Sequence, residues 1–412
     1  MRLPEHGLGF GALKERPLRR LLLAQLTSVT GDYVVIAALP FAVFAMGGTV
    51  AQVGLAFGTA AILQVGLVLW GGVAGDRFNR RAVMIGADLA RFGSQGTLAI
   101  LLVFGVAQYW QLLVVQVIHG AGTAFFQPAM TGLVPEVVGR ERRQDANALL
   151  EVAMAAAAMT GPAIAGGAIA LAGPGWAFGL DAVTFAISAM CLSGIRVASK
   201  AEAAVDAGDS VFEDLREGWR EFRQRTWLWV IVLEFAALNA LVFAPFYVLG
   251  AAIADQALGG AAAWAVILTA AGAGQLAGGL LALVCRPDRP LLVGTMLLVS
   301  WAAPLLLLAY GASVATVAVA AAVASATLAL FGTLWNTTLQ SQVPVHQLSR
   351  VSSYEWLGSM AVLPLGFALA GFAQHAVGSE TSLLAAAGIV LVATATVVRL
   401  PSIRGLRAEA AA

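Results

Sequence analysis

Ten residues, rich in charge and glycine, join two long apolar stretches of this chain: Gly72-Val73-Ala74-Gly75-Asp76-Arg77-Phe78-Asn79-Arg80-Arg81. Charge is strongly disfavoured inside a bilayer, so such a dense polar cluster is expected in a short loop at the membrane surface. Glycine tolerates the backbone angles of a tight turn and lets neighbouring helices approach closely. The stretch therefore predicts two membrane helices joined by a short polar loop.

The composition of the whole chain supports a membrane protein. Of the 412 residues, 59% are hydrophobic and 11% are charged, whereas a soluble protein carries about 25% charged residues. The net charge of +1 gives no reason to expect a nucleic-acid partner. Cys191 and Cys285 both lie in apolar contexts, which argues against a disulfide framework or a metal site. We therefore expect the lipid bilayer as a partner and no cofactor.

Twelve stretches of the chain are long enough to span a membrane, since a helix needs about 20 apolar residues to cross about 30 Å of hydrocarbon. They run over residues 18–46, 51–74, 82–104, 108–133, 147–171, 176–196, 227–253, 260–284, 290–310, 314–340, 352–376 and 381–399. We therefore predict an all-α membrane protein with twelve transmembrane helices in two pseudo-symmetric six-helix bundles. The N-terminal half covers residues 1–197, a cytoplasmic central loop covers 198–226, and the C-terminal half covers 227–412.

The distribution of basic residues predicts the orientation. Of the 24 lysines and arginines, all except Arg91 lie in the N-terminal segment, the even-numbered loops, the central segment with its edge or the C-terminal tail. Basic residues accumulate in the cytoplasmic loops of membrane proteins. Both termini and the central loop are therefore predicted to face the cytoplasm.

Several motifs resemble those of the major facilitator superfamily, and in particular its drug:proton antiporters of the macrolide- and siderophore-exporter type. Besides the polar loop they are Gly31-Asp32, Ala87-Asp88-Leu89-Ala90-Arg91, Asp181-Ala182-Val183-Thr184-Phe185, Leu334-Trp335-Asn336 and the Gly161–Gly167 stretch of the fifth span, which resembles the antiporter motif of exporters. A basic residue often found in the fourth span of related antiporters is not matched, and His119 lies in roughly that region. The resemblance implies the major facilitator fold in a bacterial cytoplasmic membrane, and we expect a monomer.

Three ionisable residues within predicted spans are candidates for proton coupling: Asp32, His119 and Glu234. Asp32 lies about 14 residues, or roughly 21 Å, into the first span, near mid-bilayer, where the low dielectric disfavours a carboxylate. The resemblance implies that spans 1, 4, 7 and 10 line a central cavity, so His119 could face Asp32, and the ordinary histidine pKa of about 6.5 suits a relay. Structural alternatives are open: Asp32 bonded to Thr30, the imidazole bonded to a backbone carbonyl or to Gln116, and Glu234 paired with a loop arginine.

The remaining charges within the spans are expected to be structural. Asp88 and Arg91 are three residues apart on one helix, so they share a face and can neutralise each other. Asp181 lies close to the outer end of the sixth span.

The polar loop has a mechanical interpretation. The resemblance implies that Asp76 docks near the N-terminus of the eleventh span when the cytoplasmic side is closed, where the helix dipole favours a carboxylate. The arginines can pair with acids of the neighbouring loop, and acids at the starts of spans five and eleven can join the same gate. The predicted gate comprises Gly72, Asp76, Arg77, Arg80, Arg81, Glu151 and Glu355. The alternative is that the loop is only a topology signal.

The fifth span carries the antiporter-like residues Gly161, Pro162, Gly166 and Gly167. Proline lacks the N–H that the helix ladder needs, and glycines allow close helix approach. A bend that helps to seal the outer side is one interpretation, and ordinary packing of a glycine-rich helix is the other.

Aromatic and amide side chains in spans 1, 4, 7 and 10 suggest a substrate cavity. The candidates are Tyr33, Phe126, Gln127, Asn239, Phe243, Trp335 and Asn336. A wide apolar cavity with few polar anchors suits lipophilic small molecules. We therefore predict a proton-coupled exporter of such molecules that works by alternating access.

Other functions are open. An importer of the same fold is one, and an uncoupled facilitator, which would keep its activity after Asp32→Asn, is another. A non-transporting receptor or scaffold is a third. An enzyme is not expected, because no cluster of histidine and acidic residues has the spacing of metal ligands, and no Walker-type phosphate loop suggests ATP drive.

Overall fold

The computed structural model describes residues 15–138, 143–195, 219–282 and 284–407, and the regular structure within these ranges is helical. Contacts between helices divide the chain into two compact units. The first comprises residues 1–48 and 59–199, and the second comprises residues 49–58 and 200–412. Most of the predicted central loop of residues 198–226 lies outside the described residues, namely its residues 198–218.

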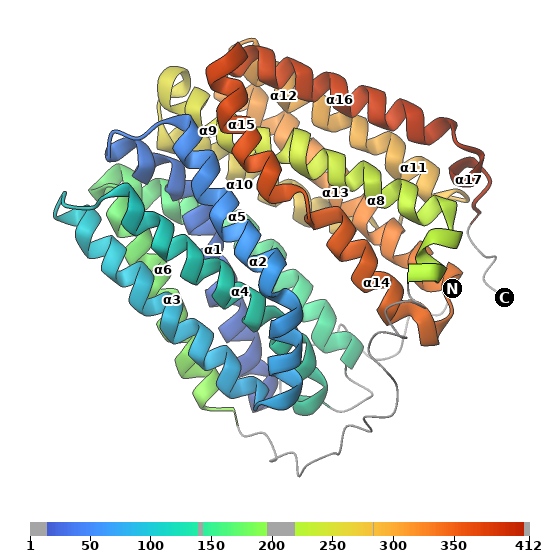
Figure 1. The fold of residues 1–412 in the computed structure, drawn as a ribbon, viewed down its shortest axis with the longest axis horizontal. Coiled ribbons are helices and arrows are strands. Elements are labelled where there is room, and N and C mark those ends of the chain that lie inside the picture. The colour runs from blue at the N-terminus through green and yellow to red at the C-terminus, as the bar shows by residue number, and fades with distance from the viewer. Residues whose placement is uncertain (1–14, 139–142, 196–218, 283, 408–412) are drawn as a thin grey trace. The chain divides into compact units, whose positions relative to one another are not determined.

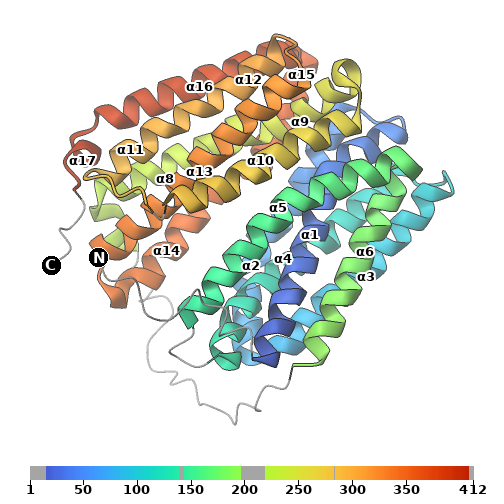
Figure 2. The same cartoon turned by 180° about the vertical axis from the view of Figure 1, so that it is seen from behind.

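The first unit is built from long helices that pack side by side (Figures 1 and 2). They are α1 (Arg16–Ala45), α2 (Val50–Arg77), α3 (Arg80–Val103), α4 (Tyr109–Val137), α5 (Arg143–Ala172) and α6 (Pro174–Ser193), of which the beginning of α2 belongs to the second unit. Helix α6 packs against α1 and α3, while α1 also packs against α5 and α3 against α4. Helices α1 and α5 are followed by Gly47 and Gly173, whose positive φ angles of 75° and 89° suit glycine.

The second unit contains helices that are interrupted more often. Its elements are α8 (Thr226–Leu238), η3 (Asn239–Phe243), α9 (Ala244–Ile253), η4 (Ala254–Leu258), α10 (Ala261–Ala282), α11 (Pro290–Leu297), η5 (Leu298–Trp301), α12 (Ala302–Ala309), α13 (Val314–Gln342), α14 (Val345–Met360), α15 (Leu363–Val377), α16 (Ser379–Arg399) and α17 (Pro401–Arg404). The wider π-type turns of η3 come directly before Pro245, which has no N–H to donate to the preceding turn.

Glycine lets helices α10 and α13 of the second unit pack closely. An added Cβ at Gly274 or Gly278 on α10 would collide with the carbonyl oxygens of Ala322 and Ala326 on α13. The two glycines are four residues apart and therefore face the same neighbour. Small residues at this spacing let the backbones of membrane helices approach closely.

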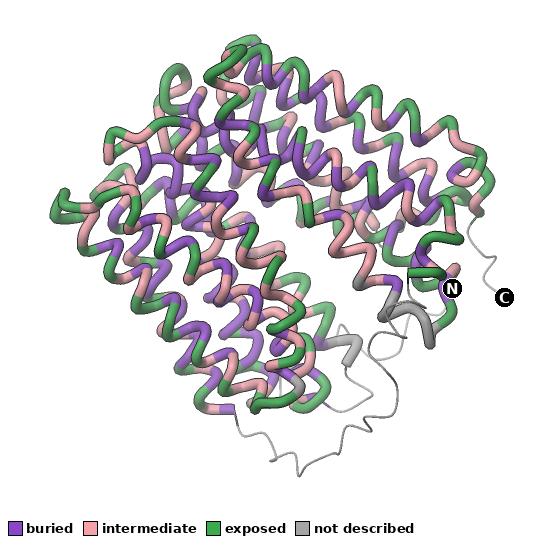
Figure 3. The backbone as a smooth tube through the Cα atoms, viewed as in Figure 1, coloured by how far each residue is buried: buried purple, intermediate pink, exposed green. Residues whose placement is uncertain are grey.

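Eleven helices within the described residues are long and apolar enough to cross a membrane. They correspond to every predicted span except the third, with bounds that agree within a few residues. Helix α3 is 24 residues long but carries charge along its length, including Asp88 and Arg91, so the count of twelve stays a prediction. Large apolar side chains such as Leu171 and Val392 are exposed, and exposed residues follow the outer faces of the helices (Figure 3), as expected of surfaces that contact lipid.

Candidate functional site

A cluster of ionisable side chains lies inside the first unit, where four of its helices meet. It consists of Asp32 on α1, Asp88 and Arg91 on α3, His119 on α4 and Asp181 on α6. The side chains of Asp88 and Arg91 are almost completely buried. Those of Asp32 and His119 remain 20% and 16% exposed, so the cluster has a buried side and a partly accessible side.

Arg91 lies at the centre of the buried side. Its Nη2 atom donates to Asp88 Oδ1 at 2.6 Å, and the other carboxyl oxygen of Asp88 accepts from Ser188 Oγ at 2.6 Å. The guanidinium carbon also lies 4.2 Å from the ring centroid of Phe185 and 4.9 Å from that of Phe126. A charge-assisted hydrogen bond and two aromatic faces therefore hold the cation in place. The predicted neutralisation of Asp88 by Arg91 matches this geometry.

Asp32 lies on the accessible side, between two nitrogen atoms. Its Oδ1 atom is 3.8 Å from Arg91 Nη1 and 3.7 Å from His119 Nε2. Both distances are too long for a hydrogen bond, and Asp32 Oδ1 has no hydrogen-bond partner among the described residues. At this range in a low dielectric, electrostatic attraction is still substantial. The carboxyl group can therefore gain or lose a proton at this oxygen without breaking a hydrogen bond there.

The structural alternatives for Asp32 and His119 do not match the contacts observed. Thr30 Oγ1 donates to the backbone carbonyl of Leu26 at 2.6 Å rather than to Asp32. Within the described part of the chain, neither His119 Nδ1 nor Gln116 Oε1 has a hydrogen-bond partner. The structure thus brings His119 to Asp32, as the cavity prediction suggested, and not to Gln116.

Asp181 is a member of the cluster that the sequence analysis did not recognise. Its side chain lies against Gly31, the residue directly before Asp32, because a Cβ at Gly31 would collide with Asp181 Oδ1 and Thr184 Oγ1. The crossing of α1 and α6 creates this contact, and a sequence alone does not show which faces two helices present to each other. The one available signal was the glycine beside Asp32, since its missing side chain leaves room for another group.

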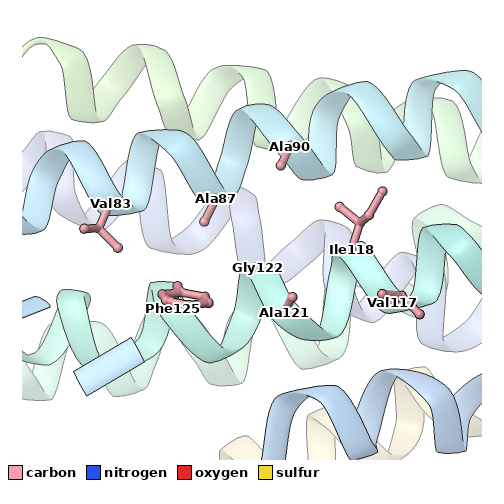
Figure 4. Close-up of a pocket in the computed structure, with 8 residues that line it drawn as sticks. All are labelled: Val83, Ala87, Ala90, Val117, Ile118, Ala121, Gly122 and Phe125. Carbon is pink, nitrogen blue, oxygen red and sulfur yellow. The ribbon is translucent and has the colours of Figure 1, made fainter. Parts of the chain in front are cut away.

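An apolar groove runs between α3 and α4 of the same unit (Figure 4). It is open to the surface, has a volume of about 340 Å³ and is lined by Val83, Ala87, Ala90, Val117, Ile118, Ala121, Gly122 and Phe125. The Cγ and Cδ atoms of Arg91 lie 2.9 Å from the position that a Cβ of Gly122 would occupy, so the stem of this arginine passes behind the groove. A lining of this kind offers only apolar contacts, which suit a lipophilic molecule.

Phe126 does not line a cavity, in contrast to the prediction. Its ring is 1% exposed and belongs to a core cluster with Leu21, Met84 and Leu133. Because the ring also lies against the Arg91 guanidinium, Phe126 supports the charged cluster. Two other cavity candidates, Tyr33 and Gln127, are partly buried.

The arginines of the polar loop join neighbouring helices within the first unit. Arg80 donates to the carbonyl oxygens of Gly75 and Gly132 at 3.1 and 2.8 Å, and its Nη1 lies 2.8 Å from Glu136 Oε1. Arg81 donates to the carbonyl oxygen of Ile195. Glu136 is the neighbouring acid that the sequence analysis expected but did not name.

The other predicted gate residues differ in their exposure. Arg77 and Glu151 are exposed, and Gly72 is partly exposed with no neighbour near its missing side chain. The side chain of Asp76 lies outside the described part of the structure, so its docking on the eleventh span stays a prediction. Glu355 is partly buried, and its side chain is within hydrogen-bonding reach of Trp335.

The antiporter-like stretch packs α5 against α1. A Cβ at Gly161 would lie 2.5 Å from Tyr33 Cβ and 2.9 Å from the carbonyl oxygen of Thr30. Gly166 is buried, whereas Gly167 is exposed with nothing within 4 Å of its missing Cβ. Helix α5 is continuous through Pro162. Close approach therefore holds for Gly161, which favours the packing interpretation at that position.

In the second unit, Glu234 on α8 is buried, and neither carboxyl oxygen has a hydrogen-bond partner among the described residues. One turn later Asn239 begins η3 and donates from Nδ2 to the carbonyl oxygen of Ser359 at 3.0 Å. Helix α14 ends at Met360, so Asn239 supplies a donor to a carbonyl group in its last turn.

The remaining cavity candidates of the second unit take part in aromatic contacts or face outward. The Phe243 ring lies edge-on to Trp301, with centroids 4.6 Å apart. Trp335 contacts Phe331 and Trp227 at 6.4 and 5.8 Å. Asn336 is exposed. Only Asn336 is thus freely accessible among these candidates.

Comparison with known proteins places this geometry in context. The model of the Major Facilitator Superfamily matches residues 21–361. The multidrug efflux pump Tap of Mycobacterium tuberculosis is 26% identical over 408 residues, which cover 95% of this chain and 94% of Tap. Macrolide efflux protein A of Streptococcus pyogenes is 23% identical over 174 residues, and that match spans 42% of this chain and less than half, 43%, of that protein.

Solved structures share the fold. The nucleoside transporter NupG superposes with a TM-score of 0.72 at 12% identity, over 92% of this chain and 98% of NupG. A bacterial homologue of the iron transporter ferroportin, in an inward-facing state, gives 0.67 at 18% identity, over 93% of this chain and 99% of that one. At these identities the likeness concerns the fold alone.

Proposed function

This chain belongs to the Major Facilitator Superfamily, and we propose that it exports lipophilic small molecules across the membrane in exchange for protons. Membership makes it a multi-pass membrane transporter of small molecules. The direction of transport is supported by the two relatives named as efflux proteins, of which Tap is matched along almost its whole length.

The Asp32 site is the observation that carries the proposal of proton coupling. Its carboxylate form is attracted by Arg91 and His119 at 3.8 and 3.7 Å, while the low dielectric around it favours the neutral acid. Two opposing influences of this kind allow the group to load and release a proton during a transport cycle. We place the route to water on the side where the Asp32 side chain is 20% exposed, since its Oδ1 atom itself is buried.

The proposed substrate class is inferred from the apolar groove of the first unit. The groove between α3 and α4 is lined by aliphatic side chains and by Phe125. Such surfaces gain free energy by covering hydrocarbon or aromatic groups and provide few donors for sugars. We infer amphipathic, lipophilic substrates such as antibiotics, siderophores or secondary metabolites.

The same proposal includes the membrane, the orientation and the oligomeric state of the protein. The separation of the basic residues supports both termini on the cytoplasmic side. The bacterial sources of the efflux relatives support the cytoplasmic membrane of a bacterium. Each chain would contain its own proton site, because the Asp32 cluster is formed by helices of one unit, and a monomer would suffice.

The test is substrate-driven proton movement in proteoliposomes that contain an internal pH dye. Wild type, Asp32→Asn and the control Glu380→Gln, an exposed acid at the start of α16, are compared with tetraphenylphosphonium, a macrolide and a siderophore. We expect protons to move opposite to substrate in wild type and control and to stop in Asp32→Asn. Transport by wild type without proton movement would leave an uncoupled facilitator. Proton movement in the same direction as substrate would indicate symport.

A further inference from the structure

The interior of the first unit holds more acids than bases. Asp32, Asp88 and Asp181 face a single guanidinium, that of Arg91, and the imidazole of His119. Helix α5 also packs here, and the ionisable side chain it contributes among those described is the exposed Glu151. Buried charges need partners. Because Asp88 already neutralises Arg91 at 2.6 Å, two carboxyl groups remain without a dedicated counter-charge.

The surroundings of Asp181 favour a carboxyl group that carries its proton. The side chain is fully buried, and neither oxygen has a hydrogen-bond partner among the described residues. Thr184 Oγ1 lies beside it but donates to the backbone carbonyl of Asp181 at 2.7 Å. A hydroxyl group has one proton to donate, so Thr184 cannot also donate to a carboxylate. Its oxygen can accept a hydrogen bond from a protonated Asp181.

We propose that Asp181 is a second proton-binding group of this site, so that the cluster exchanges two protons per cycle. The inference rests on the proposed function, since it assigns a second proton to the same site. When Asp32 releases its proton, its carboxylate is a base on the residue that follows Gly31, against which the buried acid lies. The proton of Asp181 then leaves its carboxyl oxygen, whose electron pair stays behind, and bonds to the carboxylate of Asp32. From there it reaches water on the accessible side.

Infrared difference spectroscopy tests the proposal without a substrate. The purified protein is titrated from alkaline to acidic pH, and the carbonyl stretch of protonated carboxyl groups is recorded for wild type, Asp32→Asn, Asp181→Asn and the control Glu380→Gln. We expect wild type and the control to show one titrating component that belongs to Asp32 and a second that belongs to Asp181. Each cluster variant should lack one component, and Asp181→Glu should shift the component that Asp181→Asn removes.

The outcomes separate this inference from the proposed function. If Asp32→Asn removes a titrating component but Asp181→Asn leaves the spectrum unchanged, the second proton is refuted and Asp32 stays a proton site. A component of Asp181 that is present at every pH would also refute it, because a proton that never leaves is structural. If neither variant changes the spectrum, both ideas fail. Should Asp181→Asn not fold, the shift in Asp181→Glu decides.

Discussion

Replacing Arg91 by methionine would leave Asp88 buried without its counter-charge. The substitution keeps a long, flexible side chain but removes the 2.6 Å ion pair and the contacts of the guanidinium with Phe126 and Phe185. Removing one partner of a buried pair typically costs about 3–5 kcal/mol. The variant Arg91→Met is therefore expected to destabilise the first unit strongly.

Protonation of Asp88 limits the loss of stability in Arg91→Met, and this loss should therefore depend on pH. The orphaned Asp88 can take up a proton on folding, which at pH 7 costs about 4 kcal/mol, or 1.36 kcal/mol for each pH unit above an ordinary pKa of about 3.9. At pH 5 the same step costs about 1.5 kcal/mol. The folded variant binds one proton more than its unfolded chain, so its stability rises as the pH falls. The difference from wild type should shrink accordingly.

Urea unfolding in detergent micelles, followed by tryptophan fluorescence at pH 5, 6 and 7, measures the difference. The double variant Asp88→Asn/Arg91→Met removes both members of the 2.6 Å pair and serves as the control. It should recover most of the loss at pH 7 and show little pH dependence relative to wild type. The reasoning is refuted if the loss in Arg91→Met is equal at pH 5 and 7, or if the double variant is no more stable than the single one.

Two further predictions concern close contacts, and the same unfolding assay measures both. Gly31→Ala should lower the free energy of unfolding by about 1–3 kcal/mol, because its Cβ would collide with Asp181. The control Gly86→Ala on α3 should be neutral or slightly stabilising, because its Cβ meets nothing within 4 Å. Equal effects of the two substitutions would contradict the contact between Gly31 and Asp181. Asn239→Leu should lower the free energy of unfolding by about 1–3 kcal/mol, because it leaves the buried carbonyl group of Ser359 without its hydrogen-bond donor. A change below about 0.5 kcal/mol would show that this hydrogen bond is dispensable.

Most of the predicted spans could be recognised from the sequence because they are long apolar runs with a clear polar or glycine boundary. The turns at Gly47 and Gly173 illustrate this, since both combine a gap in apolarity with a residue suited to positive φ. The interruptions could not be predicted. The π-type turns before Pro245 and the break between α14 and α15 lie beside prolines, and a proline does not indicate by itself which hydrogen-bond register the neighbouring turns adopt.

The candidate site could be predicted only in part. Asp32 and His119 stood out because charge within an apolar run is unusual, and Asp88 and Arg91 because helical spacing relates them. The closeness of Asp32 to Arg91 and of Asp181 to Gly31 depends on how α1, α3 and α6 rotate about their axes. Periodicity in a helix that is apolar on every side does not define that rotation. The same ambiguity placed Phe126 in a cavity rather than beneath the guanidinium.

The charge of α3 has a consequence for how the protein is made. An aspartate or arginine at the centre of a helix raises its cost of insertion into the bilayer by about 2.5–3.5 kcal/mol, and α3 carries both Asp88 and Arg91. On the ribosome this helix emerges before α6, which provides Ser188 and Phe185 for the pair. A nascent chain that ends before α6 should therefore hold α3 poorly in the membrane, and the translocon must retain or readmit it until the sixth helix arrives.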